Sequence, residues 1–126
     1  MSTLRLDLAH TPESAPRARA AVREFVVENW LAARDPEAVD DALLVTSELV
    51  TNAIRHGAAP VVLVASVRDL GPEICALDLV CTDAGHWRER TADEGGRGLP
   101  LVRALCTSVA IDTTDAGTTV TAILER

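Results

Sequence analysis

Three polar residues recur at intervals of four in an otherwise apolar stretch of the sequence, namely Glu48, Asn52 and His56. On a helix, this spacing places them one above another at the margin of an apolar arc about half the circumference wide. That arc consists of Leu43, Val45, Leu49, Val50, Ala53 and Ile54. A carboxylate and an amide beside a core face can share a site, the acid as general base and the amide oxygen as metal ligand. The alternative is an ordinary polar boundary on an amphipathic helix.

A second group of candidate residues lies in a glycine-rich stretch. Asp83 and Gly85 follow directly on an apolar run, and Gly95-Gly96-Arg97-Gly98 leads into an apolar segment that begins at Leu99. Glycines before a helix let main-chain N–H groups approach phosphate oxygens, and Arg97 would add a fixed cation. This pattern favours a nucleotide phosphate site. The alternative is a flexible turn.

These residues must be positioned by elements that the hydrophobic periodicity predicts. We expect strands at Thr3–Leu8, Pro60–Val67, Ile74–Val80, Val109–Asp112 and Thr118–Leu124. We expect three helices: Pro16–Ala33, a second that runs from a cap at Asp40 or Asp41 to His56, and Leu99–Cys106. The segment Asp83–Gly98 should be a polar loop. Strands and helices are grouped separately, which predicts an α+β fold. We expect a single domain, 1–126, built as a two-layer α/β sandwich whose mixed β-sheet is covered on one face by about three helices.

The composition of the 126-residue chain excludes several classes of protein. All 12 basic residues are Arg. Without Lys there is no Walker A P-loop, no strand lysine of ordinary protein kinases and no Schiff-base chemistry. The net charge of −7 argues against a nucleic-acid binder and suits a basic protein partner.

The distribution of cysteine and histidine predicts neither disulfides nor a zinc site. Cys75, Cys81 and Cys106 are an odd number without C-x-x-C spacing, and the histidines share no metal-ligand spacing with them. No apolar run has the length of about 20 residues that a membrane helix needs, and no signal-peptide pattern is present. We therefore expect a cytoplasmic protein with no membrane association.

Taken together, four short motifs resemble the ATP-binding boxes of the GHKL superfamily, the histidine-kinase-like ATPases. They are Glu48-Leu49-Val50-Thr51-Asn52-Ala53-Ile54-Arg55-His56, Asp83-Ala84-Gly85, Gly95-Gly96-Arg97-Gly98-Leu99 and Gly117-Thr118-Thr119-Val120. Their spacing is most similar to that of the bacterial anti-sigma-factor serine/threonine kinases. The resemblance extends from Arg17 to Leu124.

The resemblance implies ATP and Mg²⁺ as cofactors and gives each matching residue a role. It implies that Asn52 coordinates Mg²⁺ and that Glu48 is the base for the attacking hydroxyl. It implies that Asp83 accepts a hydrogen bond from the adenine amino group, with Gly85 allowing close approach and Thr118 supporting that end. The remaining cofactor-binding residues that it implies lie at or beside the phosphate lid: Gly96, Arg97, Gly98 and Leu99.

The resemblance also implies function and partners. It implies a kinase that phosphorylates a STAS-type anti-anti-sigma protein and sequesters a sigma factor. Two departures favour a non-catalytic anti-sigma-like binding module instead: Trp87 stands where the family usually has a second glycine, and the segment from His86 to Asp93 is short for a lid. A detached histidine-kinase ATPase domain is a weaker alternative. An exposed edge strand at Thr3–Leu8 could pair with another chain, so a homodimer is compatible with the sequence.

Overall fold

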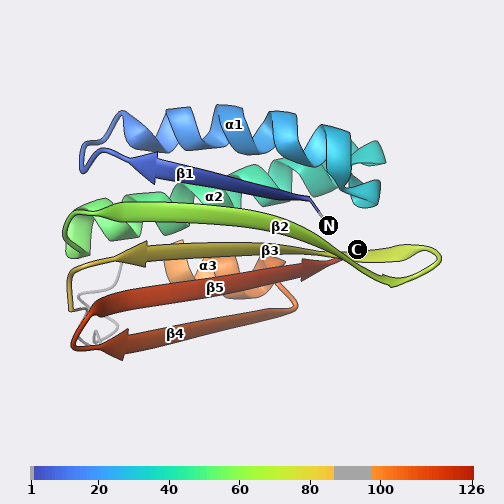
Figure 1. The fold of residues 1–126 in the computed structure, drawn as a ribbon. Coiled ribbons are helices and arrows are strands. Elements are labelled where there is room, and N and C mark those ends of the chain that lie inside the picture. The colour runs from blue at the N-terminus through green and yellow to red at the C-terminus, as the bar shows by residue number, and fades with distance from the viewer. Residues whose placement is uncertain (1, 87–97) are drawn as a thin grey trace.

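The computed structural model describes residues 2–86 and 98–126 and forms two layers, helices over a β-sheet (Figure 1). In chain order the elements are β1 (Thr3–Leu8), α1 (Ser14–Asn29), the 3₁₀ turn η1 (Leu31–Arg34), α2 (Pro36–His56), β2 (Val61–Gly71), β3 (Ile74–Asp83), α3 (Gly98–Leu105), β4 (Ser108–Thr114) and β5 (Gly117–Glu125). The predicted order of strands and helices is confirmed, as is the α+β class.

The sheet has the order β1-β2-β3-β5-β4 and is antiparallel at every pairing. The expectation of a mixed sheet is therefore wrong. The reason is the β4–β5 hairpin, which inserts β5 between β3 and β4. β3 and β4 run in the same direction, but they are not neighbours, so no parallel ladder forms.

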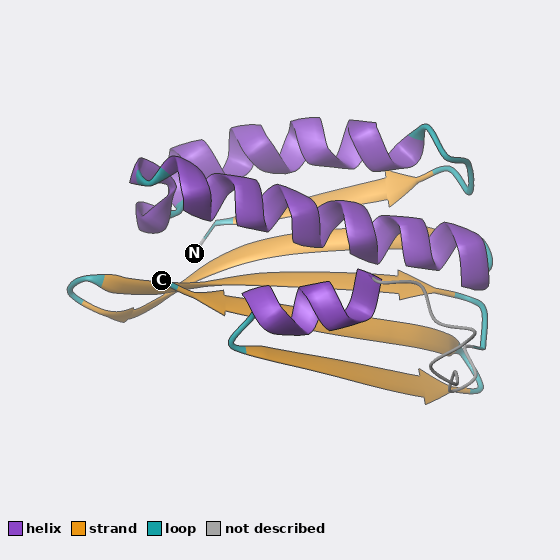
Figure 2. Ribbon diagram, turned by 180° about the vertical axis from the view of Figure 1, so that it is seen from behind, coloured by secondary structure: helices purple, strands orange, loops and turns teal. Residues whose placement is uncertain are grey.

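All three α-helices pack on one face of the sheet (Figure 2). Burial alternates along β2, where Leu63 and Ala65 face the helices and their neighbours face outward. Leu49, at the centre of the apolar arc predicted for α2, is completely buried. The core consists mainly of Leu, Val and Ala, as the scarcity of aromatic residues requires.

Two helix boundaries differ from the predictions by more than two residues. The first helix ends at Asn29 and not at Ala33, because Trp30 adopts an extended conformation and the chain then makes a 3₁₀ turn. The second helix starts at Pro36, not after Asp40. Asp35 is its N-cap and accepts a hydrogen bond from the main-chain N–H of Glu37 at 3.0 Å. Pro is favourable at the first helical position, where no N–H is needed, so Asp35-Pro36 begins the second helix.

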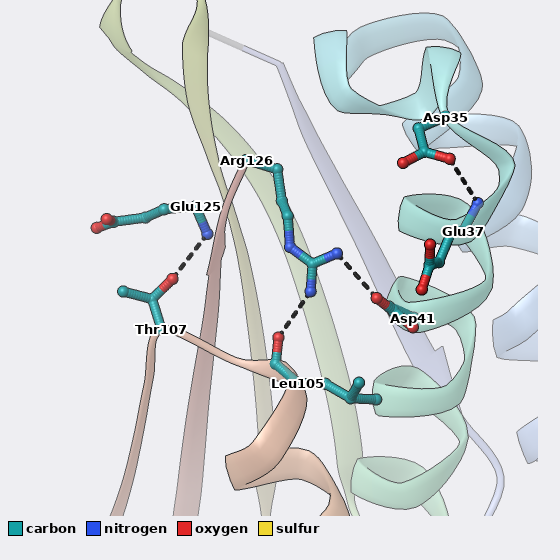
Figure 3. A network of polar contacts seen from close by, with 7 residues as sticks. All are labelled: Asp35, Glu37, Asp41, Leu105, Thr107, Glu125 and Arg126. Carbon is teal, nitrogen blue, oxygen red and sulfur yellow. Dashed lines mark hydrogen bonds and ion pairs between the residues drawn. The ribbon is translucent and has the colours of Figure 1, made fainter.

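A single arginine at the end of β5 connects α3 to α2 (Figure 3). The Arg126 guanidinium donates to the Asp41 carboxylate and to the main-chain oxygen of Leu105, both at 2.8 Å. Leu105 is the last residue of α3, where a cation is favourable because the helix carbonyls point outward. Arg126 thus fixes the C-terminal end of α3 against the helical layer.

Candidate functional site

The predicted motifs meet at one end of the sheet. α2 ends there, β3 ends at Asp83 and β5 begins at Gly117 (Figure 1). Asp83 lies opposite Thr118 in the β3–β5 ladder. The Ala84 N–H donates to the Ala58 main-chain oxygen at 2.9 Å, which joins the end of β3 to the turn after α2. Segments about 30 residues apart in the sequence therefore build one site.

The Asp83 carboxylate is the central group of this site. Its side chain is buried, with 6% of the residue exposed. Its Oδ1 accepts hydrogen bonds from the main-chain N–H of Gly85 at 2.7 Å and of Ala58 at 3.4 Å. A carboxylate held by main-chain donors keeps one orientation. It is suited to accept a hydrogen bond from a ligand amino group at a fixed place.

Three glycines enclose the carboxylate. A Cβ on Gly57 would overlap the Asp83 carboxyl group and lie 2.5 Å from the Ala53 oxygen. A Cβ on Gly85 would lie 2.6 Å from the Gly57 Cα, so these two main chains are in contact. Gly117 has a φ of 138°, a conformation that side chains rarely adopt, and a Cβ there would overlap the Asp83 main-chain oxygen. Glycine is required at these positions because the main chain itself forms the wall of the site.

Thr118 secures the loop after Asp83. It is buried, and its hydroxyl donates to the Gly85 main-chain oxygen at 2.9 Å. The structure therefore brings together three of the predicted site residues: Asp83, Gly85 and Thr118.

Glu48 and Asn52 are half-buried on the C-terminal half of α2, one turn apart on a continuous helix. The Asn52 amide nitrogen is buried and has no hydrogen-bond partner among the described residues. Buried amide groups normally have partners, so an orphaned N–H donor on the half of α2 that ends at the Asp83 site indicates a place for a ligand that accepts a hydrogen bond. One residue before Glu48, the Ser47 hydroxyl accepts a hydrogen bond from Arg19 of α1 at 2.8 Å.

The donor set fits Mg²⁺ bound together with a phosphate ligand better than a metal held by protein alone. The described residues contain no group of three or more His, Cys, Asp or Glu side chains that could hold a metal. Mg²⁺ commonly takes only one or two protein oxygens, with phosphate and water completing its shell. A single amide oxygen from Asn52 fits that pattern.

The site also perturbs a neighbouring thiol. Burial raises the pKa of Cys81 to about 12, and the negative charge of Asp83 adds to the shift. Cys81 faces the core two residues before Asp83 and is 2% exposed. Its thiol is therefore a buried apolar group and no nucleophile at neutral pH.

The predicted phosphate-binding residues are described only in part. Gly98 and Leu99 begin α3, whose N-terminal end is directed toward the end of the sheet where β3 ends (Figure 2). Gly96, Arg97 and Trp87 lie outside the described residues.

Sequence reasoning missed two of the three glycines around Asp83. Gly57 was given no role in the site, and Gly117 appeared only as the first residue of the fourth motif. The available signal was their position: Gly57 directly follows the motif that ends at His56, and Gly117 directly precedes Thr118. Arg19 carried no signal in the sequence, because its contact with Ser47 joins two helices.

Comparison with known proteins agrees with this geometry. A family model for the histidine kinase-like ATPase domain matches residues 8–124. Among curated protein sequences, none matches the chain. No helix in the described part of the chain is long and apolar enough to cross a membrane.

Two solved structures are similar in fold. The crystal structure of the RsbU and RsbW domains of Rv1364c from Mycobacterium tuberculosis matches the whole chain with a TM-score of 0.71 and 26% identity. The histidine kinase domain of the blue-light activated histidine kinase from Erythrobacter litoralis EL346 matches 70% of the chain with a TM-score of 0.52 and 24% identity. The present chain accounts for 33% of the first of these structures and 44% of the second.

Proposed function

Because the chain belongs to the histidine kinase-like ATPase family, we propose that it is an anti-sigma-factor serine/threonine kinase. It would bind ATP with Mg²⁺, phosphorylate a STAS-type anti-anti-sigma protein and sequester a sigma factor. The observation that carries this proposal is the arrangement of Asp83, enclosed by glycines, at the same end of the molecule as the C-terminal half of α2, which bears Glu48 and Asn52. A base is needed only if a proton must be removed, so Glu48 favours transfer over binding alone.

The nucleotide would bind with its adenine at Asp83. The oriented carboxylate accepts a hydrogen bond from the adenine amino group, and the main chain at Gly85 permits close approach. Thr118 holds that loop in place through Gly85. Asn52 would hold Mg²⁺, and the phosphates would lie toward Gly96, Arg97, Gly98 and Leu99.

Transfer would proceed by in-line displacement at the γ-phosphorus. Glu48 removes the proton from the acceptor hydroxyl, whose oxygen forms a bond to phosphorus while the bond to the bridging oxygen of ADP breaks. Bound Mg²⁺ would supply charge neutralisation at the phosphates. The chain's own contribution is orientation, together with a half-buried carboxylate one helical turn from the metal ligand.

The protein partners are proposed from the similarity to a chain that contains an RsbW domain and from the charge of the molecule. A net charge of −7 favours docking on a basic surface and adds to the rate of encounter with it. A cytoplasmic location agrees with this proposal, because sigma factors act there.

Nucleotide binding is tested by titration calorimetry with ATP and Mg²⁺. We expect saturable binding that Asp83→Asn weakens by about 1.5–3 kcal/mol, since one hydrogen bond to a charged acceptor is lost. Asp112→Asn, an equivalent change at an exposed position of β4, should leave the affinity unchanged. Asn52→Ala should remove the part of the affinity that depends on Mg²⁺ while circular dichroism stays native. Absence of ATP binding by the unmodified protein at millimolar nucleotide would refute the proposal.

Catalysis is tested by incubation with labelled ATP and a purified STAS-domain protein. Glu48→Gln keeps the size of the side chain and removes its charge. We expect it to retain ATP affinity and to lose about 10²–10⁴-fold in phosphorylation rate. Glu24→Gln, on an exposed face of α1, is the matched control. Equal rates for Glu48→Gln and the unmodified protein would show that Glu48 is a boundary residue only.

A second candidate function is a nucleotide-dependent binding module without transfer. The presence of Trp87 at the usual second glycine favours it. Saturable ATP binding with no phosphorylation by either the unmodified protein or Glu48→Gln would select this alternative.

A further inference from the structure

A cavity of about 720 Å³ lies at the end of the molecule opposite the Asp83 site. The C-terminal end of α1, Trp30, η1 and the β2–β3 hairpin form its walls. A second hollow of about 560 Å³ shares Asn29 and Asp69 with it and continues to Ser2. Figure 1 shows why this space exists: the β2–β3 hairpin projects beyond the start of β1. The proposed kinase function uses no residue of this region.

The edge of β2 is unpaired where it borders the cavity. The β1–β2 ladder ends where the Val67 N–H donates to the Ser2 oxygen at 3.2 Å, but β2 continues to Gly71. Cys75, opposite Asp69, exchanges both of its main-chain hydrogen bonds with Arg126 of the neighbouring strand. The main-chain groups of Asp69 therefore face the other edge, in line with those of Val67. Among residues 2–86 and 98–126, no strand lies beside β2 there.

Trp30, which lines the same cavity, carries a buried donor. Trp30 is 2% exposed, and its indole N–H has no acceptor among the described residues. An orphaned buried donor is unfavourable, so an occupant that supplied an acceptor would stabilise it. On the α1 side of the cavity, Val27 is 61% exposed and offers an apolar contact.

We propose that this cavity binds an extended peptide segment of a protein partner, which adds to β2 as a short strand at Asp69. Strand addition uses both features of this region, the unpaired main-chain groups at Asp69 and the adjoining cavity. In this binding mode, main-chain hydrogen bonds supply affinity and alternate side chains of the added strand enter adjoining pockets. The segment runs antiparallel to β2, in line with β1, and places an acceptor at the Trp30 N–H. Glu28 and Asp69 outnumber Arg34 among the charged residues of the cavity wall, so the segment carries a basic residue. This proposal is independent of the kinase function.

The first test tethers the occupant. The β1–β2 register pairs Thr3 with Ser66, so a residue added directly before Met1 would face Asp69. We would extend the full chain there with Arg-Val-Thr-Val-Arg, which gives a high effective concentration. We expect amide hydrogen exchange at Asp69 to slow by at least about tenfold relative to the unextended chain. The same extension with Pro as its last residue cannot return an N–H to the Asp69 main-chain oxygen, so it should protect the Asp69 amide much less. Equal exchange in the extended and unextended chains would overturn the proposal.

The second test uses the free peptide acetyl-Arg-Val-Thr-Val-Arg-amide and the fluorescence of Trp30. The background variant is Trp87→Phe, which leaves Trp30 as the sole tryptophan. We expect a saturable change in emission and at least about tenfold weaker binding when Val27→Asp is added. Ala20→Asp is the matched control, since Ala20 is exposed two turns earlier on the same face of α1. Equal affinities of the Val27→Asp and Ala20→Asp variants, or no saturable change, would refute the assignment.

Discussion

Alkaline pH should unfold this protein through its thiols. The sequence contains no Tyr, and all of its basic side chains are Arg, so cysteines are the only side chains that ordinarily titrate between about pH 8 and about pH 12. Burial raises the pKa of Cys81 to about 12 and that of Cys106 to about 11, from an ordinary value of 9.0. Burial and a hydrogen bond to Asp69 raise the pKa of Cys75 as well. Each thiol is therefore harder to ionise in the folded chain than in the unfolded one.

The sign and size of the effect follow from linkage. The stability that depends on a protonated Cys81 is complete below the unfolded pKa of about 9, and it is lost as pH rises toward the folded pKa of about 12. In this window the unfolded chain releases a proton that the folded chain keeps. For Cys81 alone, the free energy of unfolding should fall by about 1 to 2 kcal/mol at pH 10 and by about 3 kcal/mol at pH 11.

Urea unfolding followed by circular dichroism, at several pH values under reducing conditions, measures this loss. Near pH 10, Cys81→Ala should reduce the slope of the unfolding free energy against pH by up to about 1.4 kcal/mol per pH unit. The same substitution lowers the stability at neutral pH, because it leaves a cavity. Cys106→Ala should flatten it less, because Cys106 is only half-buried and its pKa is less shifted. If Cys81→Ala and the unmodified protein lost stability in parallel above about pH 9, the burial argument for Cys81 would be wrong.

Three further substitutions test the elements that position the site. Gly57→Ala should abolish nucleotide binding, as measured by calorimetry, because the added methyl group overlaps the Asp83 carboxyl group. In the control Gly71→Ala, the added methyl group lies no closer than 3.5 Å to its nearest neighbour, so this variant should bind the nucleotide normally. Asp35→Ala should lower the urea unfolding free energy by about 1 kcal/mol through loss of the α2 cap, and Asp40→Ala should change it little. Arg126→Gln should lower the thermal midpoint by a few degrees, since it removes an ion pair worth about 1 kcal/mol and releases the end of α3.

Hydrophobic patterns in the sequence predicted individual strands and helices, because each of these elements depends on residues close together in the chain. The alternation of Leu4, Leu6 and Leu8 predicted β1 with the bounds observed, and the run that ends at Val67 predicted a hairpin strand. In each case, a repeating apolar face was sufficient, because the core buries that face against a neighbouring layer. The start of α2 was predicted wrongly because the cap was placed at Asp40 or Asp41, although Asp35 can also cap a helix and proline is compatible with the first turn.

Contacts between distant segments could not be predicted in this way. The enclosure of Asp83 by Gly57 requires that the end of β3 lie against the end of α2, which no local pattern encodes. The antiparallel sheet depends on where the β4–β5 hairpin inserts, which is a property of the whole topology. The cavity beside Trp30 arises from the difference in length between β1 and β2. The sequence therefore named most of the candidate residues of the site but not what surrounds them.

In the proposed function, recognition of the nucleotide and transfer of its phosphate rest on separate parts of the site. Main-chain donors at Gly85 and Ala58 orient Asp83, and neither lies on α2. Glu48 is positioned by α2 alone, more than two turns before the helix ends. A change at Glu48 therefore leaves the surroundings of Asp83 intact, and a change at Gly57 removes binding while the base stays in place. For this reason the same fold can serve either a kinase or a binding module, and the phosphorylation assay on the unmodified protein and on Glu48→Gln distinguishes the two.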